Sequence, residues 1–363
     1  MKPKVLFTDG EGPIVFKDLA ADVTEKVVPG LFPVLSFYDD YLAEIGTEGY
    51  QAGDTLALVV PHFLAHGVKD KDIANEAKDA KLCFGVEEYV SELKKDEWNI
   101  RIISTAYSQM WELVGEHLGI PIQDIACTKL DLKALKESFG SKDFYARVLA
   151  AEKNILASTP LANEAMREVD QGKSVVEVLG KNPKFTPLRE SLDHFYWDEL
   201  KNLGYQTLEA VTVIGGKRKI DAAQNFAREL GLSLSDIPYV GDSITDDAIH
   251  KRLKDEGGLP IAINGNAYAL RNARVAVATE DMRNVRPILD AWQAGGFEAV
   301  KSRIDESNQS FMVGGKEGSP IHEEPSHYYH IVKWDNPANQ RELRQVHGEF
   351  RRRVRGAATA KLG

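Results

Sequence analysis

The sequence predicts an α/β fold built on a Rossmann-like, doubly wound parallel sheet with mostly helical cap insertions. Short apolar, β-prone runs recur along the 363 residues, and each ends in a polar or glycine-containing turn. Amphipathic helical patterns lie between several of these runs, and strands that alternate with helices form parallel sheets. Ligands bind beyond the carboxyl ends of the strands in such sheets. The turns that follow the runs are therefore the first place to look for a functional site.

Five apolar runs are expected to be strands, and three segments between them are expected to be helices. The strands cover residues 5–8, 100–103, 210–214, 237–240 and 259–263. The helices cover residues 86–93, 110–118 and 220–230, where apolar side chains recur at helical spacing.

Two long helical stretches interrupt this alternation, as the length of the chain allows. Residues 17–80 are expected to form a helical cap and residues 136–204 a second, mostly helical insertion. The sheet core is then expected in residues 1–16, 81–135 and 205–300, followed by a loop-rich C-terminal appendage in residues 301–363. The cap core is expected to include one apolar helix face formed by Leu56, Val59, Val60, Phe63 and Leu64.

The charge distribution argues against nucleic-acid binding by the main body of the chain. The net charge is −10, and residues 341–363 hold seven Arg or Lys against two Glu, which leaves −15 for residues 1–340. The one basic run contains Arg351, Arg352, Arg353 and Arg355. We interpret this run as a solvated helix end or loose tail, with a site for an anionic partner as the alternative.

Cysteine usage and hydropathy favour a protein of a reducing compartment. Cys83 and Cys127 do not have the spacing of a disulfide scaffold or a thiolate metal site. The N-terminal apolar run is too short for a signal peptide, and no run is long enough to span a membrane. We therefore expect a cytoplasmic protein without a membrane partner.

Polar side chains follow four of the expected strands, which turn preference alone does not explain. They are Asp9 and Glu11, Ser104 and Thr105, Lys217 and Lys219, and Asp242, Asp246 and Asp247. Carboxylates from two strand ends can hold Mg²⁺, which prefers oxygen ligands and commonly bridges to phosphate. A hydroxyl and a lysine can bind phosphate oxygens, one carboxylate can attack phosphorus, and a neighbouring acid can protonate the leaving alcohol. The set predicts phosphoryl transfer.

In this order, the four elements resemble the four motifs of the haloacid-dehalogenase-like (HAD) superfamily of phosphohydrolases. Phe7 to Gly12 is similar to the first motif, Ile103-Ser104 to the second, Lys219 with Gly231 twelve residues on to the third, and Gly241-Asp242 with Asp246 to the fourth. The resemblance covers residues 1–16, 84–130 and 205–285. Within it, residues 85–132 look closest to the phosphoserine-phosphatase branch. The core motifs are also similar to those of archaeal HAD-type proteins known as subunit R of an energy-converting hydrogenase.

The resemblance implies a role for each matched residue. Asp9 would be the nucleophile and a metal ligand, Glu11 the acid and base, Ser104 a phosphate ligand and Lys219, rather than Lys217, the phosphate-binding lysine. Mg²⁺ would be held by Asp9, the backbone carbonyl of Glu11, Asp242 and Asp246. The implied activity is hydrolysis of a small phosphorylated metabolite through an aspartyl-phosphate.

Alternatives remain open at this point. Position 11 is Glu where most family phosphatases have Asp, which bears on the substrate class. A phosphomutase or phosphotransferase of the same superfamily, or a catalytically silent regulatory subunit, would carry the same motifs. Residues 214–218 lack the spacing of a nucleotide P-loop. The histidines at 322, 327 and 330 lack zinc-protease spacing, and we interpret them as part of a polar loop.

Overall fold

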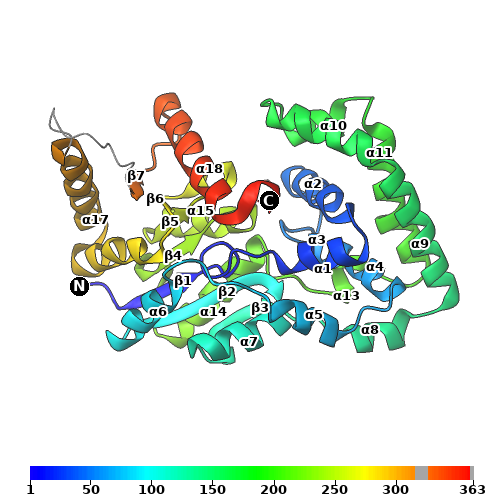
Figure 1. The fold of residues 1–363 in the computed structure, drawn as a ribbon, viewed down its shortest axis with the longest axis horizontal. Helices are drawn as coiled ribbons and strands as arrows, with labels where there is room; N and C mark the ends of the chain where they lie inside the picture. The colour runs from blue at the N-terminus through cyan, green and yellow to red at the C-terminus, as the bar shows by residue number, and fades with distance from the viewer. Residues whose placement is uncertain (315–325, 360–363) are drawn as a thin grey trace.

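A seven-stranded sheet runs through the centre of the described residues, which are 1–314 and 326–359 of this computed structural model (Figure 1). The strand order is β3-β2-β1-β4-β5-β6-β7, with β1 to β6 parallel and β7 antiparallel. The first six positions follow the Rossmann-type order, so the predicted fold class is confirmed. The strands are β1 (Val5–Thr8), β2 (Asn99–Tyr107), β3 (Ile125–Thr128), β4 (Pro238–Gly241), β5 (Leu259–Ile263), β6 (Val275–Thr279) and β7 (His327–Ile331).

Helices cover both faces of the sheet and form the cap layer beside it (Figure 1). The helices within and around the core are α6 (Val86–Lys95), α7 (Ser108–Leu118), α13 (Thr207–Ala210), α14 (Lys217–Glu229), α15 (Asp247–Glu256), α16 (Ala267–Asn272), α17 (Arg286–Gly314, with a kink at Gly295 and Gly296) and α18 (Pro337–Thr359). The cap helices are α1 (Leu19–Val27), α2 (Leu31–Glu44), α3 (Thr55–Leu58), α4 (Val60–Ala65), α5 (Asp70–Ala77), α8 (Leu132–Phe139), α9 (Lys142–Ala157), α10 (Thr159–Asp170), α11 (Thr186–Asp193) and α12 (Leu200–Asn202), with π-helical turns at Val176–Lys181 and His194–Glu199.

The sheet is buried on both faces because successive side chains of a strand point in opposite directions. In β1, Val5 and Phe7 pack with Phe226 of α14 and Leu253 of α15. The intervening Leu6 belongs to the larger core on the opposite face. Burial on both faces explains why the central strands are continuous apolar runs.

The two predicted insertions are helical and pack against each other. Helices α1 to α5 lie between β1 and β2, while α8 to α12 follow β3. Helix α4 packs on α9, and α2 contacts α9 and α10. The expected apolar face around Val60 is buried as cap core, although it belongs to two short helices, α3 and α4, rather than one.

The prediction of a strand over residues 210–214 was wrong. Helix α13 ends at Ala210, and the next residues run across the ends of β2 and β3 without joining the sheet. The Ile214 amide donates to Thr128 Oγ1 at 3.0 Å, and Thr105 Oγ1 donates to the Ile214 carbonyl at 3.2 Å. Side-chain hydroxyls therefore replace the backbone ladder here, and the segment leads directly into α14.

The described part of the expected C-terminal appendage extends the sheet. Strand β7 pairs with β6 from Val275–Ile331 to Thr279–His327, and α18 packs on β6. His327 and His330 therefore lie on a strand, and their interpretation as loop residues was wrong. The glycines and prolines between 315 and 325, together with His322, lie outside the described residues.

Candidate active site

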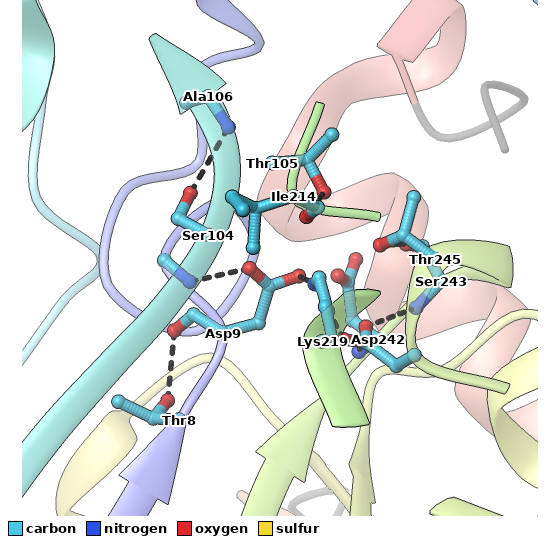
Figure 2. Close-up of polar contacts among 12 residues, drawn as sticks. Thr8, Asp9, Ser104, Thr105, Ala106, Ile214, Lys219, Asp242, Ser243 and Thr245 are labelled. Atoms are coloured by element: carbon cyan, nitrogen blue, oxygen red, sulfur yellow. Dashed lines mark hydrogen bonds and ion pairs between the residues drawn. The ribbon is translucent and has the colours of Figure 1, made fainter. Parts of the chain in front are cut away.

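Three buried carboxylates meet at the carboxyl ends of β1 and β4. Figure 2 shows two of them, Asp9 and Asp242, on either side of Lys219. Asp9 follows β1 and Asp242 follows β4, and the Asp9 amide donates to the Val240 carbonyl at 2.7 Å. With Asp246, each offers one carboxylate oxygen within 4.8 Å of the others, and this is the one such group of potential metal ligands among the described residues. Neighbouring strands of the sheet thus bring together residues more than 230 positions apart.

Lys219 is the cation at the centre of this group. Its Nζ lies 2.8 Å from Asp9 Oδ2 and 2.7 Å from Asp246 Oδ1, and its side chain is fully buried in the first turn of α14. Burial lowers the pKa of Lys219, but the charges of Asp246 and Asp9 outweigh it and raise that pKa overall. Lys219 therefore stays an ammonium. Lys217, two residues earlier, is exposed.

Asp246 has a partner for each lone pair that its carboxylate can offer. Oδ1 accepts from Lys219 and from Tyr239 Oη at 2.7 Å, while Oδ2 accepts from the amides of Asp242 and Ser243 at 2.9 and 3.1 Å. Burial raises the pKa of Asp246, but the charge and hydrogen bond of Lys219, together with His250 and the Tyr239 hydroxyl, outweigh burial and hold that pKa at about 2. Asp246 is thus an ionised anchor, and it would have to give up a hydrogen bond to coordinate a metal directly.

Asp9 and Asp242 are less completely satisfied. Asp9 Oδ1 accepts from the Gly10 amide at 2.6 Å, while burial and the neighbouring carboxylates of Asp246 and Asp242 raise the pKa of Asp9 well above its usual range. Asp242 Oδ1 is buried without a hydrogen-bond partner among the described residues. A buried, unpartnered carboxylate oxygen beside a second carboxylate fits a hard divalent cation such as Mg²⁺, which takes oxygen ligands.

Close packing at the first turn requires glycine. Gly12 has a φ of +104°, and a Cβ there would collide with the carboxylate of Asp242. A Cβ on Gly10 would collide with the Trp111 ring. The two glycines therefore let the chain turn tightly enough to present Asp9 and Glu11 side by side.

Glu11 joins the first turn to the cap. Its Oε1 accepts from the Leu19 amide at 3.0 Å, at the first residue of α1. Burial and the nearby Asp18 carboxyl raise the pKa of Glu11 well above its usual range. A carboxyl with a raised pKa keeps its proton closer to neutral pH, as a general acid requires.

A cavity of about 70 Å³ lies between the core and the cap. From the cap, α2 and the residues around α3 contribute Phe32, Ser36, Asp39, Gly53, Thr55 and Leu56. From the core come Asp9, Glu11, Asp18, Thr105, residues 242–245 and Arg355. None of residues 136–204 lines this cavity, so the first insertion, rather than the second, covers the strand ends.

The two hydroxyls of β2 differ in what they can donate. Both lie inside the strand, which continues to Tyr107, and not after it as expected. Ser104 Oγ accepts from the Ala106 amide at 3.2 Å, and its proton has no acceptor among the described residues. The Thr105 hydroxyl proton is already committed to the Ile214 carbonyl. The Ser104 hydroxyl therefore still has a proton that it can donate, whereas Thr105 is the residue of this pair that lines the cavity.

The interpretation of the basic run as a solvated helix end was wrong for two of its four arginines. Arg351 is 2% exposed and Arg355 is largely buried, and both contact Asp242. Leu343, His347 and Arg351 recur at four-residue intervals on the buried face of α18, and Arg355 continues that face, whereas Arg352 is exposed. This i, i+4 stripe is the sequence signal that could have shown the burial.

No histidine among the described residues belongs to a group of potential metal ligands. His330 Nδ1 lies 3.4 Å from His347 Nε2, which joins β7 to α18. Burial lowers the pKa of both, and it lowers that of His347 further.

No described helix has the length and apolarity that a membrane span requires.

Comparison with solved structures finds the same fold in an archaeal protein. The structure of gene product AF1437 from Archaeoglobus fulgidus superposes with a TM-score of 0.77 at 24% identity, covering 100% of this chain and 99% of that one. Phosphoserine phosphatase structures, one with a phospho-aspartyl intermediate analogue and one with bound substrate, give TM-scores of 0.47 and 0.46 at 16% and 15% identity. Each covers 79% of this chain and 98% of the other. No protein-family model and no curated protein matches the sequence.

Proposed function

We propose that this protein is a Mg²⁺-dependent phosphatase that hydrolyses a small phosphomonoester through an aspartyl-phosphate on Asp9. The observation that carries the proposal is that Asp9, Glu11 and Asp242 line one small cavity, with the buried Lys219 ammonium 2.8 Å from Asp9 and one oxygen of Asp242 without a partner among the described residues. Each group has a separate task in phosphoryl transfer. The resemblance of the same residues to the HAD motifs supports the same assignment.

In the first step, an Asp9 carboxylate oxygen bonds to phosphorus as the bond from phosphorus to the substrate alcohol breaks. Glu11 gives its proton to the departing alcohol oxygen. Lys219 holds Asp9 in place through its 2.8 Å ion pair and lies where it can balance charge on the phosphoryl oxygens. Ser104 can donate its unused hydroxyl proton to one of those oxygens.

In the second step, Glu11 takes a proton from water, and the water oxygen bonds to phosphorus as the bond to Asp9 breaks. Inorganic phosphate leaves, and Asp9 returns to its starting carboxylate. Because the same group protonates the alcohol and deprotonates water, Glu11 ends the cycle with its proton restored.

The residues that would hold Mg²⁺ are Asp9, Asp242 and the backbone carbonyl of Glu11, with Asp246 fixing the turn that carries Asp242. A bound divalent cation would offset the repulsion between these carboxylates and a phosphate dianion. Since the cavity holds about 70 Å³ and one water needs about 10–15 Å³ of such volume, the substrate is a small one.

Turnover of p-nitrophenyl phosphate and of a panel of small phosphorylated metabolites tests the proposal. We expect Mg²⁺-dependent release of phosphate that excess chelator abolishes and that Asp9→Asn lowers by about 10³-fold or more. Asp40→Asn is a matched control, because Asp40 is a cap aspartate that does not line the cavity. A folded protein that binds Mg²⁺ but turns over no member of the panel would instead be a non-catalytic binding protein on the same fold.

A further inference from the structure

Helix α18 brings its C-terminal end to the candidate active site. It follows β7 in the chain, packs on β6 and runs toward cap helix α2 (Figure 1). Arg355 lines the same cavity as Phe32 and Ser36 of α2. The C-terminal segment is therefore part of the wall that encloses Asp9.

Two arginines of α18 hold one side of Asp242. The Nη1 of Arg351 donates to the Asp242 carbonyl at 3.0 Å and also contacts Oδ2. The Nη1 of Arg355 donates to the same Oδ2 at 2.7 Å. The other oxygen, Oδ1, has no partner among the described residues. The arginines thus leave one oxygen of Asp242 for a cation and do not block it.

Arg355 has more hydrogen-bond donors than the described residues can satisfy. A guanidinium carries five N–H groups, and the bond to Asp242 is the one hydrogen bond that Arg355 makes within that part of the chain. Its side chain is 7% exposed, and its Nε is buried without an acceptor in the part of the chain that the structure describes. Because buried donors without acceptors are costly, the donors that Asp242 leaves unused indicate a ligand that brings acceptor oxygens.

The position of Arg355 identifies the chemistry of that ligand. It lies at the cavity beside Asp9 and Glu11, where a phosphoryl group would have to sit for Asp9 to attack it. Guanidinium groups bind phosphate oxygens through directed, charge-assisted hydrogen bonds. Lys219, which is already shared between Asp9 and Asp246, cannot cover all the oxygens of a phosphate dianion by itself.

We infer that Arg355 binds the phosphoryl group of the ligand in this cavity and that its contact with Asp242 Oδ2 holds it in position to do so. The inference rests on the proposed function for the identity of the ligand. It makes the C-terminal helix a contributor to the active site, in addition to β1, β2, β4 and the first turn of α14.

Binding of inorganic phosphate at saturating Mg²⁺, measured by isothermal titration calorimetry, tests this inference. We expect Arg355→Met to weaken phosphate binding by about 10- to 100-fold, as for the loss of charged hydrogen bonds. Arg355→Lys keeps the charge and should give an intermediate loss. Arg352 is exposed and lies three residues before Arg355 on the same helix. The Arg352→Met variant should therefore bind phosphate as the unchanged protein does. The affinity for Mg²⁺ alone should not fall in any of these variants, because Arg355 contacts Oδ2 and not Oδ1.

Two results would overturn the inference: unchanged or tighter phosphate binding by Arg355→Met, and no phosphate binding by the unchanged protein. Tighter binding would show that α18 obstructs the cavity. If Arg355→Met does not fold, as thermal unfolding would reveal, Arg355→Lys decides by the same criterion. Weaker phosphate binding in Arg355→Met together with no turnover of any phosphomonoester would support this inference while the proposed function fails.

Discussion

Two buried polar clusters in this molecule contain similar side chains but differ in their surroundings. In the core, the Asp246 carboxylate accepts from Lys219 and Tyr239 at the floor of the candidate active site. In the cap, the Glu152 carboxylate of α9 lies 3.0 Å from His62 Nδ1 of α4, and His62 Nε2 lies 3.0 Å from Tyr196 Oη. Both clusters are buried carboxylate networks that also contain a tyrosine. The core cluster borders a cavity with unpartnered groups, whereas His62 joins two helical insertions.

The comparison teaches that burial and a perturbed pKa do not by themselves mark a catalytic site. Burial lowers the pKa of His62, and Glu152 has a lowered pKa because the hydrogen bonds from His62 and His66 outweigh its burial. The core cluster differs because polar groups next to it have hydrogen-bond acceptors or donors that no described residue uses. These groups are Asp242 Oδ1, Ser104 Oγ and the guanidinium of Arg355. Networks in which every polar group has a hydrogen-bond partner stabilise packing. Polar groups without partners next to a cavity are available to bind a ligand.

Among the predictions that distinguish the two clusters, the largest effect is expected from replacing Lys219 in the core. Lys219→Met leaves two buried carboxylates without their cation, so the free energy of unfolding should fall by about 3–5 kcal/mol. In whatever fraction stays folded, kcat/KM for an aryl phosphate should fall by about 10²-fold or more. Lys217→Met is the matched control, since Lys217 is exposed and should tolerate the change. The reverse ranking of the two lysines would show that the third motif has been placed in the wrong register.

An intermediate effect is expected at the hydroxyls of β2. Ser104→Ala should lower kcat/KM by about 10-fold, because a hydroxyl with a free proton is lost from the proposed phosphate site, and should lower the free energy of unfolding by about 1 kcal/mol, because that hydroxyl also accepts from the Ala106 amide. Thr105→Val removes the hydrogen bond to Ile214, so it should lower the free energy of unfolding by about 1 kcal/mol. Full activity in Ser104→Ala would remove Ser104 from the phosphate site.

The smallest effect on turnover is expected in the cap cluster. His62→Leu should change kcat/KM by less than about threefold but lower the free energy of unfolding by about 1–3 kcal/mol. Because His62 and Glu152 both have pKa values lowered by folding, their stabilisation is complete above the unfolded pKa values of about 6.5 and 4.3 and is lost as the pH falls. Chemical denaturation between pH 7.5 and pH 5 should show this loss in the unchanged protein, and a weaker one in His62→Leu.

His194→Leu is the control for that experiment. His194 lies on the surface of the second insertion, which also carries Glu152 and Tyr196, and is 3.4 Å from Asp198, with both side chains exposed. Its removal should leave the pH dependence of the unfolding free energy as it was. A pH dependence that is identical in His62→Leu and His194→Leu would contradict the assignment of the cap cluster as the source.

Much of the fold could be predicted from the sequence because the central strands are buried on both faces. Four of the five expected strands are present, as they are continuous apolar runs that end in polar turns. The segment leading to Ile214 has the same composition, but it is held by side-chain hydroxyls of β2 and β3, which no local pattern records. Strand β7 is rich in His and Tyr, and it forms because β6 offers an unpaired edge.

The site could be predicted where each residue follows its own strand, and not where a distant segment contributes. Asp9 and Asp242 come together as expected because the parallel strands β1 and β4 end at one edge of the sheet, and Asp246 follows Asp242 in the next turn. Lys219 joins them from the first turn of α14, although the strand expected before it is absent. Arg355 reaches the same cavity from a helix near the end of the chain. A run of arginines usually indicates a solvated surface, and only the spacing of Arg351 and Arg355 with Leu343 and His347 indicates a buried face.

The central claim, that Asp9 is the nucleophile, is tested most directly by trapping the residue during turnover. An aspartyl-phosphate is reduced by borohydride to homoserine, which peptide mass spectrometry can locate. Quenching the protein with borohydride while it hydrolyses p-nitrophenyl phosphate in the presence of Mg²⁺ should give homoserine at position 9, and no such product without substrate. Steady release of phosphate with an unmodified Asp9 in every quenched sample would show that water attacks phosphorus directly, and would contradict the account.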